Sequence, residues 1–151
     1  MKGSAARGAA GPLKINMTDK TKNGRAVIAV IRYKDKILVG KKRGDLNHFF
    51  AGKWHVPSET VEDGETDEAA LIRGMMEEAG INIRVGQFIG SNISPTKKDV
   101  FWYECFADSD KVSAGSDLEE VKWTSKEGVM NICEERAGSF WPETVANYFR
   151  N

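Results

Sequence analysis

The sequence is poor in the features that would place the protein outside the ordinary globular domains. It has only two cysteines in 151 residues, Cys105 and Cys133, and they show no CxxC or metal-ligand spacing. Such usage is typical of a reducing compartment rather than of a disulfide-rich secreted protein. No apolar run approaches the roughly 20 residues that cross a bilayer, and no signal-peptide segment opens the chain. We therefore expect a soluble, cytoplasmic protein.

The chain also lacks net charge. It carries 22 basic and 22 acidic side chains, which balance to a formal charge of zero. The bulk charge therefore gives no indication of a nucleic acid or a membrane surface as partner, and any charge that matters for function must be local. A length of 151 residues suits one domain with a genuine core.

Composition divides the chain into a leader and a domain. Residues 1–22 are rich in Gly, Ala and Ser, which predicts a flexible leader or an expression remnant, with the domain at residues 23–151. Runs of β-branched and aromatic residues predict strands, and a helix is expected to begin near Pro142. The expected strands cover residues 25–33, 36–42, 55–56, 83–92, 99–107 and 119–125.

One segment, residues 67–79, has the pattern of a helix with two different faces. Thr66 is the expected N-cap, and acidic residues follow it in the first turn, where the helix dipole favours them. On a helical wheel one half is apolar and the other half carries charge and small residues. The apolar half, which we expect to pack on a sheet, is Ala69, Leu71, Ile72, Met75, Met76 and Ala79. The other half is Ala70, Arg73, Gly74, Glu77 and Glu78.

The carboxylates on that second half are candidates for metal binding. Glu65 precedes the helix and is placed to pair with Arg73, which would leave Glu77 and Glu78 free. Oxygen ligands without nearby His or Cys favour Mg²⁺ or Mn²⁺, ions that keep waters and bridge to phosphates. Such an ion would neutralise a diphosphate while water attacks phosphorus. Alternatively, the segment is a solvated helix face with ordinary surface ion pairs.

The spacing of these residues resembles the signature of the Nudix hydrolases. That signature is Gly, five residues, Glu, seven residues, Arg-Glu, an aliphatic residue, any residue, Glu-Glu, any residue, Gly and an aliphatic residue. The matching positions are Glu65, Arg73, Met75, Glu77, Glu78, Gly80 and Ile81. The stretches "GKWHVP" before the signature and "EEVKW" after it also look like the family's.

Two positions depart from the signature. Glu59 stands where the box begins with Gly, and Gly74 stands where the family has the Glu of Arg-Glu. A glycine within a helix costs about 1 kcal/mol relative to Ala, and here it also removes a family carboxylate. Either Glu59 or Glu62 returns the missing negative charge, or the site is impaired.

The resemblance implies roles for the remaining candidates. Glu77 and Glu78 would bind metal together with the backbone carbonyl of Glu59, and Arg73 and Glu65 would orient them, so that Glu77, Glu78, Arg73 and Glu65 form the catalytic group. Family members often add an acid from a loop before the last strand. The candidates for that loop acid are Asp117, Glu119 and Glu120.

Substrate-binding candidates come from the sequence around the first strands. The basic run Lys41-Lys42-Arg43 lies at the end of the second strand and could meet phosphates or simply be solvated. Trp54 could stack on a nucleobase or lie in the core. His48 and His55 lie on or beside the loop before the box, where a histidine could act as acid or base or have no catalytic role.

The resemblance implies an α/β/α sandwich with a mixed sheet between helices. The implied function is Mg²⁺-dependent hydrolysis of a nucleoside diphosphate linked to another group, with a nucleoside triphosphate or an ADP-ribose-like molecule as substrate; Pro95 lies near a proline typical of ADP-ribose hydrolases. Family members that hydrolyse GDP-sugars at carbon are an alternative, with His48 as base, although Glu77 is retained here. A nucleotide-binding module with little turnover is another. The chain could also pair as a homodimer, as many relatives do.

Overall fold

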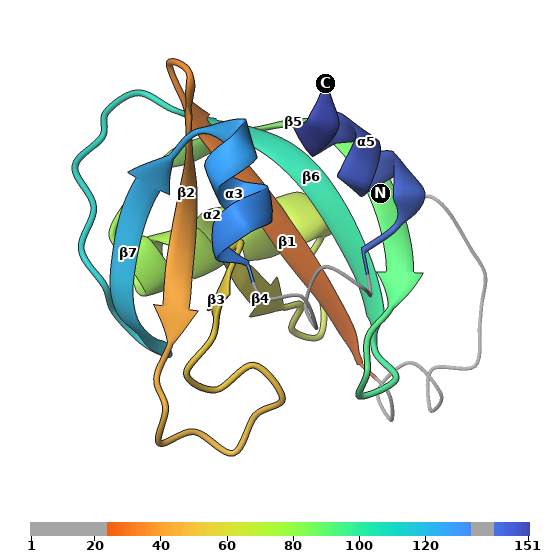
Figure 1. Cartoon of the computed structure of the whole chain (residues 1–151). Helices are drawn as coiled ribbons and strands as arrows, with labels where there is room; N and C mark the ends of the chain where they lie inside the picture. The colour runs from red at the N-terminus through yellow and green to blue at the C-terminus, as the bar shows by residue number, and fades with distance from the viewer. Residues whose placement is uncertain (1–23, 134–140) are drawn as a thin grey trace.

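The structure, a computed structural model, describes residues 24–133 and 141–151, so the expected leader lies outside the described residues. Figure 1 shows a strongly twisted sheet with helices on both sides. The strands are β1 (Arg25–Tyr33), β2 (Lys36–Lys42), β3 (Trp54–His55), β4 (Ser58–Thr60), β5 (Ile83–Ile93), β6 (Asp99–Ala107) and β7 (Leu118–Thr124), and the helices are α2 (Asp67–Ala79), α3 (Lys126–Ile132) and α5 (Glu143–Arg150). Within the described ranges, each helix is too short or too polar to cross a membrane.

The sheet is mixed, as the sequence predicts. Its path runs β3-β2-β1-β6-β5, with β7 paired to β2 and β4 paired to β1. Strands β1 and β6 are parallel, whereas the other pairs are antiparallel. The hairpin expected between residues 33 and 36 is confirmed, because Tyr33 and Lys36 are directly paired.

Two hydrophobic cores form because the side chains of β1 alternate between the faces of the sheet. Val27 and Ala29 pack with Leu71 of α2 in one core, while Ile28 and Val30 lie in the other. The second core also contains Val129 of α3 and Val145 and Phe149 of α5. Figure 1 shows α2 behind the sheet and α3 and α5 in front of it. The α/β/α sandwich is therefore confirmed.

Helix α2 begins and ends at the residues that the sequence predicts. The Thr66 hydroxyl oxygen accepts a hydrogen bond from the Ala69 amide at 3.1 Å, which satisfies one of the free donors of the first turn. Gly80 ends the helix with φ of 65°, a left-handed conformation that glycine adopts without strain.

The predicted orientation of α2 is wrong for six of the eleven residues assigned to its two faces, including Ala69, which is exposed, and Ala70, which is buried. Ile72 and Met76, expected in the core, are 39% and 45% exposed, while Gly74 and Glu78 are buried. The helix packs against β4 as well as against β1 and β5, so its buried stripe is displaced toward the charged half of the wheel. As a result, Gly74 and Glu78 face protein rather than solvent.

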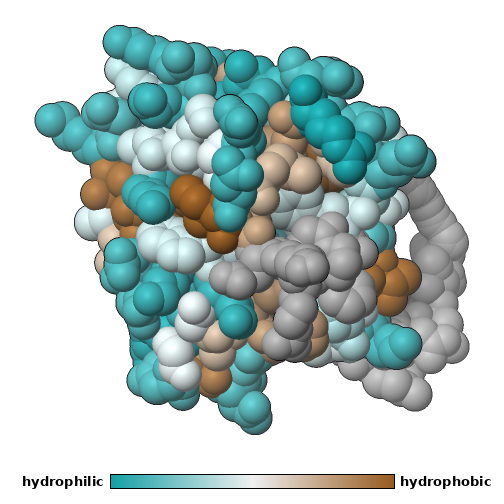
Figure 2. Space-filling model, in the orientation of Figure 1, coloured by the Kyte–Doolittle hydropathy of each residue, from teal (hydrophilic) through white to brown (hydrophobic). Residues whose placement is uncertain are grey.

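Two elements were not predicted from the sequence. Strand β4 is three residues long, and helix α3 has seven residues behind an N-cap formed by Ser125, whose side chain accepts from the Gly128 amide. In the view of Figure 2, small separate hydrophobic groups lie among hydrophilic side chains.

Candidate active site

A cavity opens at the edge of β1, where this strand changes partners. Residues 26–28 of β1 pair with β4, whereas residues 32 and 33 pair with β2. The separation of β4 from β2 leaves a cavity of about 240 Å³ that residues from β1, β2, β3 and β4 line. Its charged lining residues are Lys42, Lys53, Lys98, Glu59, Glu78 and Asp117.

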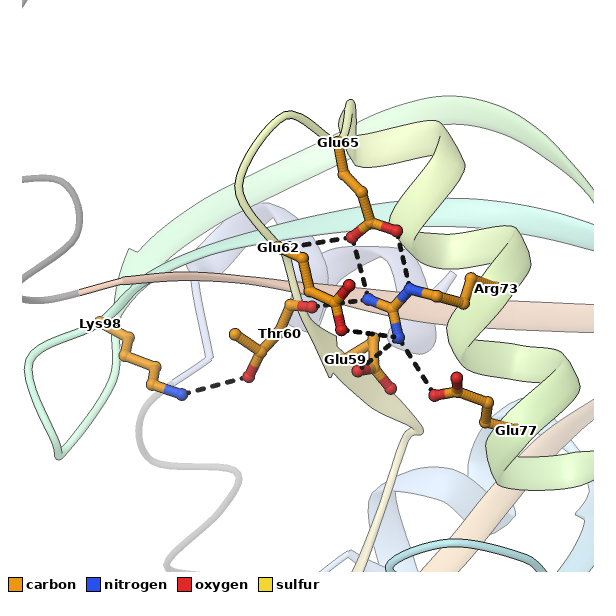
Figure 3. Close-up of polar contacts among 7 residues, drawn as sticks. All are labelled: Glu59, Thr60, Glu62, Glu65, Arg73, Glu77 and Lys98. Carbon is orange, nitrogen blue, oxygen red and sulfur yellow. Dashed lines mark hydrogen bonds and ion pairs between the residues drawn. The ribbon is translucent and has the colours of Figure 1, made fainter. Parts of the chain in front are cut away.

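Arg73 organises the carboxylates beside this cavity (Figure 3). Its Nε donates to Oε2 of Glu65 at 2.7 Å and its Nη2 to Oε1 at 2.9 Å, so this ion pair is bidentate. Its Nη1 donates to Glu59 and to Glu77, both at 3.1 Å, and its Nη2 also donates to the Thr60 carbonyl. The hydrogen bonds to the carboxylates raise the pKa of Arg73, and the bond to Glu65 has the largest effect. The hydrogen bond from Arg73 in turn lowers the pKa of Glu65. The expected pairing of Glu65 with Arg73 is confirmed. The expectation that Glu77 stays free is wrong, because the guanidinium has a further donor that holds it.

Glu59 lies directly over Gly74. A Cβ atom at position 74 would stand 2.5 Å from Cγ, 2.6 Å from Cβ and 2.9 Å from Oε1 of Glu59. Real Cβ atoms do not approach other carbons so closely, so any side chain at 74 would displace Glu59. The glycine in the middle of α2 therefore has a steric reason. Burial raises the pKa of the Glu59 carboxyl, and the Arg73 guanidinium opposes that rise.

Glu78 is a buried carboxyl group in the cavity. Only 4% of the residue is exposed, and no Lys or Arg of the described ranges forms an ion pair with it. Burial raises its pKa to about 7; Lys42 opposes the rise, and Glu59 and Asp117 add to it. A cation beside Glu78 would favour its ionised form.

The donor set suits a hard divalent cation. No three His, Cys, Asp or Glu residues within 24–133 and 141–151 are grouped closely enough to form a metal cage. Mg²⁺ does not need such a cage, because it takes one or two protein carboxylates and keeps waters or substrate phosphates as its other ligands. Glu59 and Glu78 supply two carboxylates to one cavity. Glu77 is half-exposed, bonded to Arg73 and outside the cavity lining.

The structure brings one of the three candidate loop acids to the cavity. Asp117 lines it. Glu119 instead accepts from the Gly44 amide and pairs with Lys41 at 3.4 Å, and Glu120 pairs with the same lysine at 3.9 Å. Glu119 and Glu120 thus hold the end of β2 rather than face the cavity.

The candidate substrate residues also lie elsewhere. Lys41 is held by the carboxylates of β7, and Arg43 pairs with Asp45 on the surface at 3.1 Å. Trp54 packs on the core around α3 and α5, with Lys122 over its ring. Of the basic run Lys41-Lys42-Arg43, the residue that lines the cavity is Lys42.

Aromatic rings and both histidines line the same cavity. The Phe50 ring stacks on His55 with centroids 4.9 Å apart, and both residues are in the lining together with Phe49 and His48. Burial lowers the pKa of His55 to about 4, so its ring is neutral at pH 7. The Trp141 indole donates a hydrogen bond to its Nε2 at 3.2 Å, so the ring contributes to packing around Trp141. Burial also lowers the pKa of His48. Two adjacent aromatic residues in an otherwise polar loop, Phe49 and Phe50, are the feature of the sequence that could have predicted this apolar side of the cavity.

Comparisons with known proteins agree with this architecture. The family model of the NUDIX domain matches residues 22–140. A NUDIX hydrolase from Nitrosomonas europaea has a similar fold with a TM-score of 0.71 and 17% identity, over 85% of this chain and 70% of that one. The MutT protein from Methanosarcina mazei Go1 gives 0.65 and 24%, over 84% and 90% of the two chains. A C. elegans Ap4A hydrolase, solved as a binary complex, gives 0.63 and 21%, over 76% and 91%.

The chain belongs to the Nudix hydrolase family, because the family model covers well over half of it. At these identities the solved structures establish the shared fold and leave the substrate open. Nudix hydrolases generally use divalent metals, which agrees with the oxygen donors of the cavity.

Proposed function

We propose that the protein hydrolyses a nucleoside diphosphate linked to another group, in a Mg²⁺- or Mn²⁺-dependent reaction with water attack at phosphorus. The observation that carries this proposal is the cavity that joins Glu59, Glu78 and Asp117 to three lysines and a wall of aromatic rings. Such a substrate requires three components: carboxylates to hold a cation, lysines to bind phosphates and flat rings to contact a nucleobase.

Glu59 and Glu78 would hold the divalent cation, with Glu77 next to Glu78 on α2 as a third candidate ligand. When bound, the cation would neutralise charge on the diphosphate and increase the acidity of water. Arg73 fixes the Glu59 carboxylate at 3.1 Å, and Glu65 in turn fixes Arg73. This chain of contacts orients the ligands before substrate arrives, which lowers the reorganisation needed for reaction.

Lys42, Lys53 and Lys98 would bind the phosphate oxygens, because each lines the cavity and carries a charge opposite to that of the substrate. Asp117 is the proposed base that accepts a proton from the attacking water, since it is the candidate loop acid in the cavity lining. Phe49 and Phe50 would contact the base of the nucleotide.

The substrate class includes nucleoside triphosphates, ADP-ribose-like molecules and dinucleotides of the kind named for the similar Ap4A hydrolase. A second candidate is hydrolysis of a GDP-sugar at carbon, which the position of His48 in the cavity favours. A nucleotide-binding module with little turnover is the third candidate, motivated by Gly74. Our proposal that the protein acts in the cytoplasm rests on the low cysteine content of the sequence, two residues in 151 without CxxC spacing.

Chromatographic product analysis tests the proposal. The protein is incubated with nucleoside triphosphates, ADP-ribose, diadenosine polyphosphates and GDP-sugars, each with Mg²⁺ and with chelator. We expect turnover that chelator abolishes and that the Glu78→Gln variant loses, while Glu120→Gln, which changes an exposed acid outside the cavity, keeps it. Free sugar with intact GDP would show that the bond between the sugar and the diphosphate is cleaved, and attack at carbon would then require the oxygen of water to appear in the sugar. Nucleotide binding by calorimetry without any product would favour the binding module.

A further inference from the structure

The two departures from the Nudix signature are in contact with each other. Glu59 of β4 and Gly74 of α2 are 15 positions apart in the chain, yet the side chain of the first fills the space where a Cβ of the second would begin. The signature has Gly at the first position and Glu at the second, so this chain has the two residue types interchanged. Two independent losses would not be expected to fit together sterically.

The β4 register directs the Glu59 side chain toward α2. Glu59 is paired with Val27 of β1, and paired residues of antiparallel strands share a face of the sheet. Val27 lies in the core that contains α2, so Glu59 projects to the same side. The main-chain bond from Ala29 to the Pro57 carbonyl shows that the two strands are joined there. The carboxylate of Glu59 thus extends from β4 toward α2.

Glu59 lies among the charged residues of the candidate active site. Its carboxylate is bonded to Arg73 at 3.1 Å, and its side chain is only 14% exposed. It is close enough to Glu78 and Glu77 to influence both electrostatically, and it shares the cavity with Glu78. Glu62, the other acid near this position, is 66% exposed, stands 3.8 Å from Arg73 and does not line the cavity.

We propose that Glu59 and Gly74 are a reciprocal exchange, in which the carboxylate that the Nudix signature places on the helix is supplied from strand β4 by the side chain of Glu59. Gly74 provides the space for it. Glu59 then acts as a metal ligand through its carboxylate together with Glu78. The chemical role of this ligand rests on the proposed function, whereas the steric relation between the two positions does not.

Metal binding tests the exchange without any substrate. Mn²⁺ affinity is measured by calorimetry for the parent protein, for Glu59→Gln, for Gly74→Glu and for the double variant Glu59→Gly with Gly74→Glu. We expect each single change to weaken binding by roughly tenfold or more, since even indirect supports of metal sites have effects of that size. The double variant, which restores the family arrangement, should return to within a few-fold of the parent. Glu62→Gln is the matched control and should bind as the parent does.

Several results would overturn the exchange: no Mn²⁺ binding by the parent, unchanged affinity in Glu59→Gln, or a double variant no better than Gly74→Glu alone. The outcome is separate from that of the product analysis. A protein that shows the expected Mn²⁺ pattern without turnover supports the exchange and contradicts the proposed function. A protein that turns substrate over while Glu59→Gln keeps its Mn²⁺ affinity supports the function and contradicts the exchange.

A thermal-unfolding cycle with alanine keeps the inference testable if the glutamate variants fail to fold. Gly74→Ala should lower the melting temperature of the parent, because its Cβ meets the Glu59 side chain, despite the higher helix propensity of Ala. In a Glu59→Gly background the same change should raise the melting temperature, since residue 59 then has neither the Cβ nor the Cγ that the new Cβ of residue 74 would meet. An increase of equal size in both backgrounds would show that the positions are independent and would contradict the exchange.

Discussion

Arg73 and Glu65 form a bidentate ion pair that ties helix α2 to the loop before it, with both nitrogen–oxygen distances at or below 2.9 Å. The guanidinium has further donors, and these hold the Glu59 and Glu77 carboxylates. A single side chain thus sets the positions of three acids that surround the candidate site. Lysine has one point charge and lacks this fork, so it cannot replace the arrangement.

Arg73→Lys should therefore destabilise the protein and reduce turnover. We expect a loss of about 1.5–3 kcal/mol in the free energy of unfolding, the range for hydrogen bonds to charged groups, measured by urea denaturation. Arg43→Lys is the matched control, because Arg43 pairs with Asp45 on the surface, where such pairs contribute little. Equal effects of the two changes would mean that the hydrogen bonds of Arg73 to its carboxylates contribute no more to the free energy of unfolding than a surface ion pair does.

His55 should make stability depend on pH between about 4 and 6.5. Burial lowers the pKa of the folded-state imidazole from 6.5 to about 4, so within this window the unfolded chain binds a proton that the folded chain does not. Stability contributed by the neutral ring is complete above 6.5 and is lost as pH falls toward 4, by up to about 3 kcal/mol. Urea denaturation at several pH values should show this fall in the parent protein. His55→Phe, which keeps an aromatic ring against Phe50, should reduce the fall. An unchanged pH profile in the variant would refute the assignment.

Much of the fold was predictable from the sequence because the signals were local. Alternating residues in 25–33 and the cap at Thr66 set β1 and α2 without knowledge of the rest of the chain. The buried face of α2 was not predictable, because it depends on β4, a strand of three residues that gives little periodic signal. For the same reason the wheel could not show that Gly74 is covered by Glu59.

The acidic residues of the candidate site were easier to predict from the sequence than its lysines. The helical wheel and the resemblance to the Nudix signature indicated Glu78, Arg73 and Glu65; in the structure Arg73 pairs with Glu65, and Glu78 lines the cavity. Lys53 and Lys98 come from a loop and from the turn before β6, and only the folding of the chain places them together. The choice of Lys42 over its neighbours depends on which side of β2 faces the cavity, and the run of bases does not reveal this.

Lys42 should contribute to substrate binding. For a substrate identified by the product analysis, Lys42→Ala should raise KM by about ten- to hundredfold, as expected for loss of a hydrogen bond between charged groups. Lys41→Ala is the control, because its ammonium pairs with Glu119 and Glu120 instead. Initial rates over a range of substrate concentrations and salt concentrations provide the measurement. A larger rise in KM for Lys41→Ala would locate the phosphate contact at the other lysine.

Glu78→Gln should have opposite effects without and with metal. The pKa of Glu78 is raised from 4.5 to about 7, so its ionisation destabilises the metal-free fold increasingly as pH rises through that interval. The full cost, up to about 3 kcal/mol, is present above pH 7. In chelator at pH 8 the variant should therefore melt at a higher temperature than the parent, with little difference at pH 5. Mg²⁺ should raise the melting temperature of the parent and leave that of the variant unchanged. An equal Mg²⁺ response in both proteins would remove Glu78 from the metal site.

The most direct test of hydrolysis at phosphorus is the fate of the oxygen of the attacking water. The protein is incubated with Mg²⁺ and its substrate in water enriched in ¹⁸O, and the products are analysed by mass spectrometry. We predict one ¹⁸O atom in the phosphate of one product and none in any sugar hydroxyl. Incorporation of the label at a sugar carbon, or no labelled product from folded protein with any substrate of the panel, would contradict the account.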